Sequence, residues 1–288
     1  MSWLDEQVRS GAGLVTYRTL ADFQFRGERV ALLDPERGIR KPRMLTAALS
    51  IRTTFTPPTQ VPPYDDTPGP DGLLRYKYRG TNPDHHENVA LRRAMDEHLP
   101  LMWFVGVAPG VYQAVFPVWV LAEERALLQF VVAVDEAQRF VPVGAQLPRD
   151  QREYVERLTK QRLHQPVFRA RVLTAYETTC AVCRLRHGEL LDAAHILPDT
   201  HPRGLPVVPN GLALCKIHHA AFDRNILGVR PDLVVDIRRD VLEEVDGPML
   251  RHGLQEMAGV RLLVPRSRTA RPDSELLEER YEIFRRPA

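Results

Sequence analysis

The sequence predicts an α+β protein, with a curved β-sheet in its N-terminal half and a small α+β unit in its C-terminal half. Three runs rich in Val, Phe and Trp, at 101–107, 111–121 and 127–134, are typical of strands and predict the sheet. All three cysteines lie together further along the chain, in a pattern typical of a metal site. With 288 residues, the chain is long enough for two modest domains, or for one large domain with decoration.

Composition indicates an ordinary globular protein. Apolar residues make up 44% of the chain, which is enough for a hydrophobic core, and the formal net charge of +2 favours no particular partner. Arginine supplies almost all the positive charge. Its planar fork suits phosphate and guanine edges, although a GC-rich genome would favour the same usage. No apolar stretch reaches the length of a membrane span, and the N-terminus does not resemble a signal peptide, so we expect a cytoplasmic protein.

Turn and strand signals organise residues 1–140, which we assign to a first domain. Proline, threonine and aspartate dominate 52–72, so we expect an irregular loop there. The alternating segment 73–79 predicts a strand, and 82–98 predicts a helix capped by Asn82 or Asp84. The turn Ala108-Pro-Gly110 can join the first two of the three strand runs as a hairpin.

A charged, helix-prone segment at 149–165 suits a connector, and we assign 141–165 to a helical linker. Pro166 is expected to end that helix, because proline donates no backbone hydrogen bond, and 167–176 to form another helix. Residues 166–288 are assigned to a second domain. Its arginine- and proline-rich tail is expected to end in a charged helix at 274–285.

The cysteines form a predicted structural zinc site. Cys180-Ala-Val-Cys183 can share one ion, and Cys215-Lys-Ile-His218 repeats the same spacing. Together the two pairs supply four nitrogen and sulfur ligands, the number that a closed tetrahedral Zn²⁺ site needs. The alternative is that these cysteines are merely small buried residues.

Three further segments complete a recognisable pattern within this cysteine frame. An apolar strand, Leu-Asp-Ala-Ala-His-Ile-Leu-Pro, delivers His195; Asn210-Gly-Leu-Ala-Leu-Cys follows, and then His218-His219-Ala-Ala-Phe-Asp223. The order His, Asn, His resembles the HNH (ββα-metal) endonuclease family, in particular its bacterial restriction-type members, over about 167–229. The resemblance implies a zinc-bound ββα-metal fold that cleaves DNA with a divalent ion, Mg²⁺ or Mn²⁺.

The resemblance also implies roles for single residues. His195 would be the general base, since imidazole titrates near neutral pH, and Asn210 would tie the loop and help to orient it. His219 and Asp223 lie four residues apart on one expected helix face, where they could hold the catalytic ion. Many HNH domains carry an Asp or His immediately before the base, where this chain has Ala194. Asp192, on the same strand face, is the expected substitute ligand or outer support.

The N-terminal half carries a second resemblance, at Tyr64-Asp-Asp and the following 69–78. This stretch resembles the YDG-type segment of SRA domains, which implies a curved PUA-like sheet holding a flipped, modified cytosine. Side chains on or near this strand would contact DNA: Asp71, Arg75, Tyr76, Lys77, Tyr78 and Trp103. The alternative is a strand with tyrosines on its core face and cations in solvent. The segment 84–88, with two histidines and two acids, is expected to have capping and surface roles rather than to bind a second metal.

The two resemblances together imply a modification-dependent, type IV restriction-like endonuclease that senses 5-methylcytosine in double-stranded DNA. Two other interpretations stay open: an HNH endonuclease acting on unmodified DNA, sequence-specific or not, and a catalytically degenerate, zinc-stabilised DNA-binding protein. Because one HNH site cuts one strand, double-strand cleavage would call for a homodimer.

Overall fold

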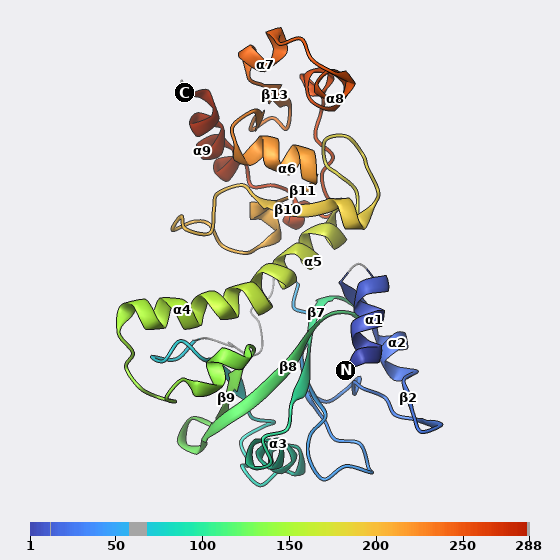
Figure 1. Ribbon diagram of the computed structural model, residues 1–288, viewed down its shortest axis with the longest axis vertical. Helices are drawn as coiled ribbons and strands as arrows, with labels where there is room; N and C mark the ends of the chain where they lie inside the picture. Colours follow the sequence, from blue (N-terminus) through green and yellow to red (C-terminus); the bar gives the residue numbers. More distant parts are fainter. Residues whose placement is uncertain (12, 58–67, 287–288) are drawn as a thin grey trace. The chain divides into compact units, whose positions relative to one another are not determined.

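The computed structural model describes residues 1–11, 13–57 and 68–286, so Tyr64 and its neighbours lie outside the described residues (Figure 1). The chain divides into two compact units, Met1–Val167 and Phe168–Ala288. The segment at 141–165, expected to be a linker, falls within the first unit. No helix among the described residues is long and apolar enough to cross a membrane.

The first unit is built on a seven-stranded sheet with the order β4-β5-β7-β8-β9-β6, in which β1 also pairs with β8. Neighbouring strands are antiparallel except β5 and β7. The strands of this unit, including a small separate hairpin of β2 and β3, are β1 (Leu14–Thr16), β2 (Gln24–Phe25), β3 (Glu28–Arg29), β4 (Ile39–Arg40), β5 (Ser50–Thr53), β6 (Leu74–Lys77), β7 (Leu101–Ala108), β8 (Val111–Glu124) and β9 (Gln129–Ala133).

The sheet curls until its two ends approach each other. The long strand β8 pairs with β7 over its first half and with β9 over its second half, with register shifts along both partners. The hydroxyl of Tyr76 in β6, at one end of the strand order, shares its proton between the carbonyl of Gly38, which precedes β4, at 3.0 Å and that of Arg52 in β5 at 3.1 Å. These bonds span the open seam of a half-barrel. The curved sheet predicted for this half of the chain is therefore confirmed.

The helices of the first unit are α1 (Ser2–Ser10), α2 (Tyr17–Ala21), α3 (His86–Asp96) and α4 (Arg149–Thr159). The predicted helix at 82–98 begins later than expected, and its cap is His85, whose Nδ1 accepts from the Glu87 amide. The prediction of Asn82 or Asp84 as the cap is therefore wrong: the Asn82 side chain accepts from the Asp84 amide within the preceding turn, and Asp84 Oδ1 lies 3.5 Å from Arg125 Nη2.

The expectation that Pro166 ends a helix is also wrong. Helix α4 continues through a π-helical turn, Lys160–His164, directly into α5 (Gln165–Ala175). In that turn the Gln165 amide bonds the Lys160 carbonyl, five residues back. The wider turn moves the carbonyls that a proline ring would otherwise clash with, so the helix accepts Pro166.

The second unit contains the predicted ββα arrangement. Strands β10 (Leu191–His195) and β11 (Gly211–Cys215) form an antiparallel hairpin, and α6 (Lys216–Asp223) follows at once and packs on β10. The other elements of this unit, besides α5, are β12 (Leu227–Val229), β13 (Val235–Ile237), α7 (Arg239–Glu243), α8 (Pro248–Gly253) and α9 (Ser274–Arg285). One core joins all these layers, through buried residues such as Phe168, Leu212, Phe222, Leu227 and Leu277.

Candidate metal centre and active site

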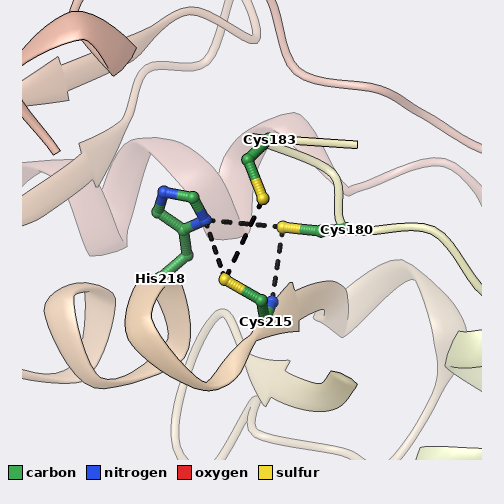
Figure 2. A group of neighbouring side chains, drawn as sticks. All are labelled: Cys180, Cys183, Cys215 and His218. Atoms are coloured by element: carbon green, nitrogen blue, oxygen red, sulfur yellow. Dashed lines mark hydrogen bonds between the residues drawn. The ribbon is translucent and has the colours of Figure 1, made fainter. Parts of the chain in front are cut away.

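The four residues predicted to bind zinc meet at one point of the second unit. Their ligand atoms all lie within 4.8 Å of one another, and Figure 2 shows the four side chains pointing together. Cys183 Sγ lies 4.0 Å from Cys215 Sγ, and His218 Nδ1 lies 3.1 Å from Cys215 Sγ and 3.5 Å from Cys180 Sγ. A tetrahedral Zn²⁺ requires separations of about 3.8 Å between sulfurs and about 3.6 Å between sulfur and nitrogen. The residues present fit zinc.

The contacts of Cys180 and His218 are compatible with metal binding. Hydrogen bonds from Cys183 and Cys215 lower the pKa of the Cys180 thiol, which favours the thiolate that a metal binds. The other ring nitrogen of His218, Nε2, lies 2.8 Å from the Gly253 carbonyl, so Nε2 carries the proton and Nδ1 is left to coordinate. Four protein ligands leave no coordination position open to water, so this centre suits a structural role rather than a catalytic one.

The next residue along the helix, His219, lies in a second cluster. Its Nε2 is 3.3 Å from Asp223 Oδ2, as the spacing of four residues predicts. Adjacent ligands of an octahedral Mg²⁺ lie about 3.0 Å apart, so the pair fits a hard divalent ion. Its Nδ1 lies 3.7 Å from Asp192 Oδ2, on the other side of the ring. Asp192 and Asp223 therefore lie on opposite sides of the His219 ring, Asp192 near Nδ1 and Asp223 near Nε2.

Cations surround Asp192. Lys216 Nζ donates to Oδ2 at 3.0 Å, and Arg169 Nε lies 3.4 Å from Oδ1. Although burial opposes the change, hydrogen bonds from His219 and Lys216 lower the pKa of Asp192. The hydrogen bond to Asp192 in turn raises the pKa of His219. This arrangement suits an outer support for His219, which was one of the two roles expected for Asp192.

His195, His219 and Asp223 line a single cavity of about 460 Å³. His195 ends β10, pairs with Gly211 of β11, and stacks its ring on Phe168 of α5, with centroids 4.0 Å apart. A Cβ at position 211 would meet Phe168 Cζ at 3.0 Å and Val172 Cγ2 at 2.5 Å. The glycine thus lets α5 approach closely enough for Phe168 to hold the imidazole in place.

Asn210 is fully buried and acts on the loop that follows His195. Its Oδ1 accepts from the Leu197 amide at 2.9 Å, and its Nδ2 donates to the carbonyls of Leu197 and Leu205, both at 3.0 Å. All its hydrogen-bonding groups are engaged with the backbone, so Asn210 suits a positioning residue. Ala194, in the place of the usual first metal ligand, is fully buried.

Sequence reasoning missed the other six residues of the cavity wall, which are Ile196, Pro198, Asp199, Asn225, Arg280 and Ile283. Arg280 comes from α9, which lies far along the chain from the cysteine frame. A signal was present: Arg280 follows Leu276 and Leu277 by four and three residues, which puts a cation on the apolar side of that helix. Phe168 was also missed, because nothing local marks it as a neighbour of His195.

In the first unit, three of the predicted DNA-contacting residues line a cavity of about 230 Å³ at the seam of the half-barrel. They are Tyr76, Lys77 and Tyr78, and Arg52, Thr53 and Arg79 line it with them. Trp103 is 1% exposed and contributes indirectly, because its Nε1 donates to Thr53 Oγ1 at 3.0 Å.

Asp71 and Arg75 lie apart from this cavity lining, in a buried ion-pair network. Arg75 Nη1 donates to Asp71 Oδ1 at 2.6 Å, and its Nη2 lies 2.9 Å from Glu124 Oε1. Burial opposes ionisation of Asp71, but the hydrogen bond from Arg75 is among the contacts that lower its pKa. With Asp71 fully buried, the pair suits a structural role better than contact with DNA.

The ligand atoms of His85, His86 and Glu87 also lie within 4.8 Å of one another. The His85 Nδ1 caps α3, and Arg37 already neighbours the other two side chains, at 3.5 Å from His86 Nε2 and 3.7 Å from Glu87 Oε1. A cation in that place disfavours a metal. The capping role expected from the sequence agrees with this, but the expected surface role is wrong for Glu87 and Asn88, which are buried.

Comparisons with known proteins bear on the second unit. Residues 180–230 match the family described as HNH endonuclease. A solved structure titled "Modification dependent TagI restriction endonuclease" is 19% identical, with a TM-score of 0.33, over 87% of this chain and 86% of that chain. A likeness at that level does not establish a shared fold. No curated protein matches the chain.

The matched segment contains the cysteine–histidine centre, the β10–β11 hairpin and α6, and His195, Asn210 and His219 follow one another along it in the order His, Asn, His. Residues 180–230 are therefore an HNH endonuclease domain, and the chain is an HNH-type DNA endonuclease.

Proposed function

We propose that the second unit hydrolyses phosphodiester bonds of double-stranded DNA at the cavity lined by His195, His219 and Asp223, which we name the catalytic cavity. The observation that carries this proposal is the meeting of these three side chains in one cavity of about 460 Å³. The donors His219 Nε2 and Asp223 Oδ2 would hold one Mg²⁺ or Mn²⁺. When bound, that ion would supply Lewis-acid stabilisation to the charge that develops on the phosphate.

His195 is the general base of the proposed reaction. Its imidazole takes a proton from water, the water oxygen forms the new bond to phosphorus, and the 3′ oxygen leaves with the bonding electron pair. The ring is held for this step by the stack on Phe168, and Asn210 holds the backbone that follows it. Asp192 Oδ2 lies 3.7 Å from Nδ1 of His219, on the opposite side of the ring from Asp223, and Nε2 faces Asp223.

We further propose that the seam cavity of the first unit reads a modified base, with 5-methylcytosine as the expected ligand. The support is chemical: the cavity combines the aromatic residues Tyr76 and Tyr78 with the cations Lys77 and Arg79 and the acid Glu36. Aromatic faces and hydrogen-bonding groups are what an extruded base requires.

Cleavage of matched plasmids tests both parts. Supercoiled plasmid carrying 5-methylcytosine and unmodified plasmid are incubated with Mn²⁺ and either wild-type protein or His195→Ala. Cleavage of methylated plasmid alone, abolished in the variant, is the expected result. Equal cleavage of both plasmids would leave the catalytic proposal standing and reject the base reader. It would favour an HNH endonuclease acting on unmodified DNA.

Tight binding without cleavage of either plasmid would instead favour the degenerate, DNA-binding interpretation. The product distinguishes a nick from a double-strand break. Linear product that forms without prior accumulation of nicked plasmid would indicate that two copies of the chain act together, as a homodimer would.

A further inference from the structure

We propose that Arg280 binds the phosphate that is cleaved, so that the C-terminal helix α9 completes the active site. This inference rests on the proposed function of the catalytic cavity. Arg280 lines that cavity together with His195, His219 and Asp223, although α9 lies outside the segment 180–230 that matches the HNH family. It is 9% exposed, which is unusual for an arginine outside a binding site.

The contacts of Arg280 hold its guanidinium without neutralising it. Its Nη1 donates to Asn225 Oδ1, its Nη2 donates to the Phe222 carbonyl, and the group lies over the Phe222 ring, 4.6 Å from the centroid. Both hydrogen-bond acceptors are uncharged. Within the described residues, no carboxylate forms an ion pair with this guanidinium, and Asp223 acts on it only through space.

A buried cation of this kind is costly unless an anion compensates it. Burial lowers the pKa of Arg280, which reflects that cost. Asp223 is the acid whose charge acts on Arg280, and it is also the residue expected to hold the divalent ion. A DNA phosphate that enters this cavity, which Asp199 also lines, would supply a compensating anion.

The geometry suits that ligand. A guanidinium has five N–H donors in a planar fork, and the two bonds to Phe222 and Asn225 use two of them. Those bonds also tie the fork to the C-terminal end of α6, next to Asp223, so its position relative to the ion ligands is set. Arginine can then grip a non-bridging oxygen of the phosphate while His195 activates water, which orients the phosphate for attack.

The test compares Arg280→Ala with Arg285→Ala. Arg285 is an exposed arginine on the same helix, so its substitution removes the same charge and introduces the same helix-favouring residue. Single-turnover cleavage of plasmid in Mn²⁺ should fall about 10²–10³-fold for Arg280→Ala, the effect of losing one charged donor in a preorganised site. Arg285→Ala should stay within about twofold of wild type, and Arg280→Lys should lie between the two.

Chemical rescue separates a phosphate contact from a structural one. Low millimolar guanidinium chloride should restore part of the cleavage by Arg280→Ala, and sodium chloride at equal ionic strength should not. Zinc content and the thermal unfolding midpoint report whether the fold survives the substitution.

Two results would overturn the inference: full cleavage by Arg280→Ala, or a loss that tracks a lower unfolding midpoint and does not respond to guanidinium. Wild-type protein that cleaves neither methylated nor unmodified plasmid would refute the proposed function, and this inference with it.

Discussion

Two adjacent histidines of one helix, His218 and His219, lie in proposed metal sites of opposite character. His218 is 2% exposed and belongs to a set of four protein ligands, with its second nitrogen bonded to Gly253. The His219 side chain is 23% exposed and faces a cavity, with Asp223 as its partner ligand. The first site is closed and suits structure. The second leaves positions for water and phosphate, which is what a catalytic ion requires.

The difference arises from helix geometry. Successive residues of an α-helix point about 100° apart, so two neighbours cannot serve the same site. In α6, the side of His218 faces the zinc cluster, and the side of His219 and Asp223 faces the catalytic cavity. A short motif can therefore place the ligands of the proposed structural centre next to those of the proposed catalytic centre, and the two should respond differently to the same perturbations.

Zinc removal should have the largest effect. Chelation of the structural ion, or Cys180→Ala, should unfold the second unit, because a site of this kind contributes about 10–16 kcal/mol and whole domains are stable by only about 5–15 kcal/mol. Circular dichroism with metal analysis measures the outcome. Withholding Mn²⁺ from zinc-loaded protein is the contrasting treatment, and should stop cleavage with the fold intact. Equal unfolding by both treatments would contradict the assignment of one site to structure and the other to catalysis.

His195→Ala should lower kcat by about 10²–10⁴-fold, the usual contribution of a general base, and leave zinc content unchanged. His187→Ala, at an exposed position before β10, is the matched control and should cleave as wild type does. Single-turnover plasmid cleavage measures both. Retained activity in His195→Ala would assign the proton transfer to another group of the cavity.

Asp223→Asn should weaken Mn²⁺ binding by about 100-fold, because a charged oxygen ligand is lost from a site with few protein ligands. Zinc content should not change, since Asp223 is not part of the cysteine cluster. Electron paramagnetic resonance of free Mn²⁺ gives the affinity directly. An unaltered affinity would show that the ion is held elsewhere.

Asp192→Asn should have the smallest effect, about a 10-fold loss of Mn²⁺ affinity, as expected for a residue that acts through a ligand. It should also move the pH dependence. Ion binding needs neutral His219, and Asp192 raises the pKa of His219, so in wild type protons compete with the ion to a higher pH. Without the carboxylate that pKa falls, and the midpoint of Mn²⁺ binding should shift to lower pH. A midpoint that shifts upward, or stays, would contradict the supporting role.

Local patterns were enough to predict much of the second unit. The repeated spacing of Cys180, Cys183, Cys215 and His218 predicted one four-ligand centre, and the four-residue separation of His219 and Asp223 predicted their pairing. Local signals were weaker guides where two effects compete. Pro166 is a helix breaker by itself, yet a π-helical turn accommodates it. The cap of α3 is His85 rather than the predicted Asn82 or Asp84.

Residues that share a strand face or a helix face could be predicted from the sequence, because those relations depend only on the 2.0 and 3.6 residue periods of the backbone. Contacts between distant segments depend instead on how the elements pack. Phe168 stacks on His195, and Asp192 contacts His219 from outside the cavity lining. Arg280 of α9 lies in the cavity wall. Tyr76 also bonds to Gly38 and Arg52 at the seam of the half-barrel. Such contacts follow from how whole elements pack, and no spacing along the chain encodes them.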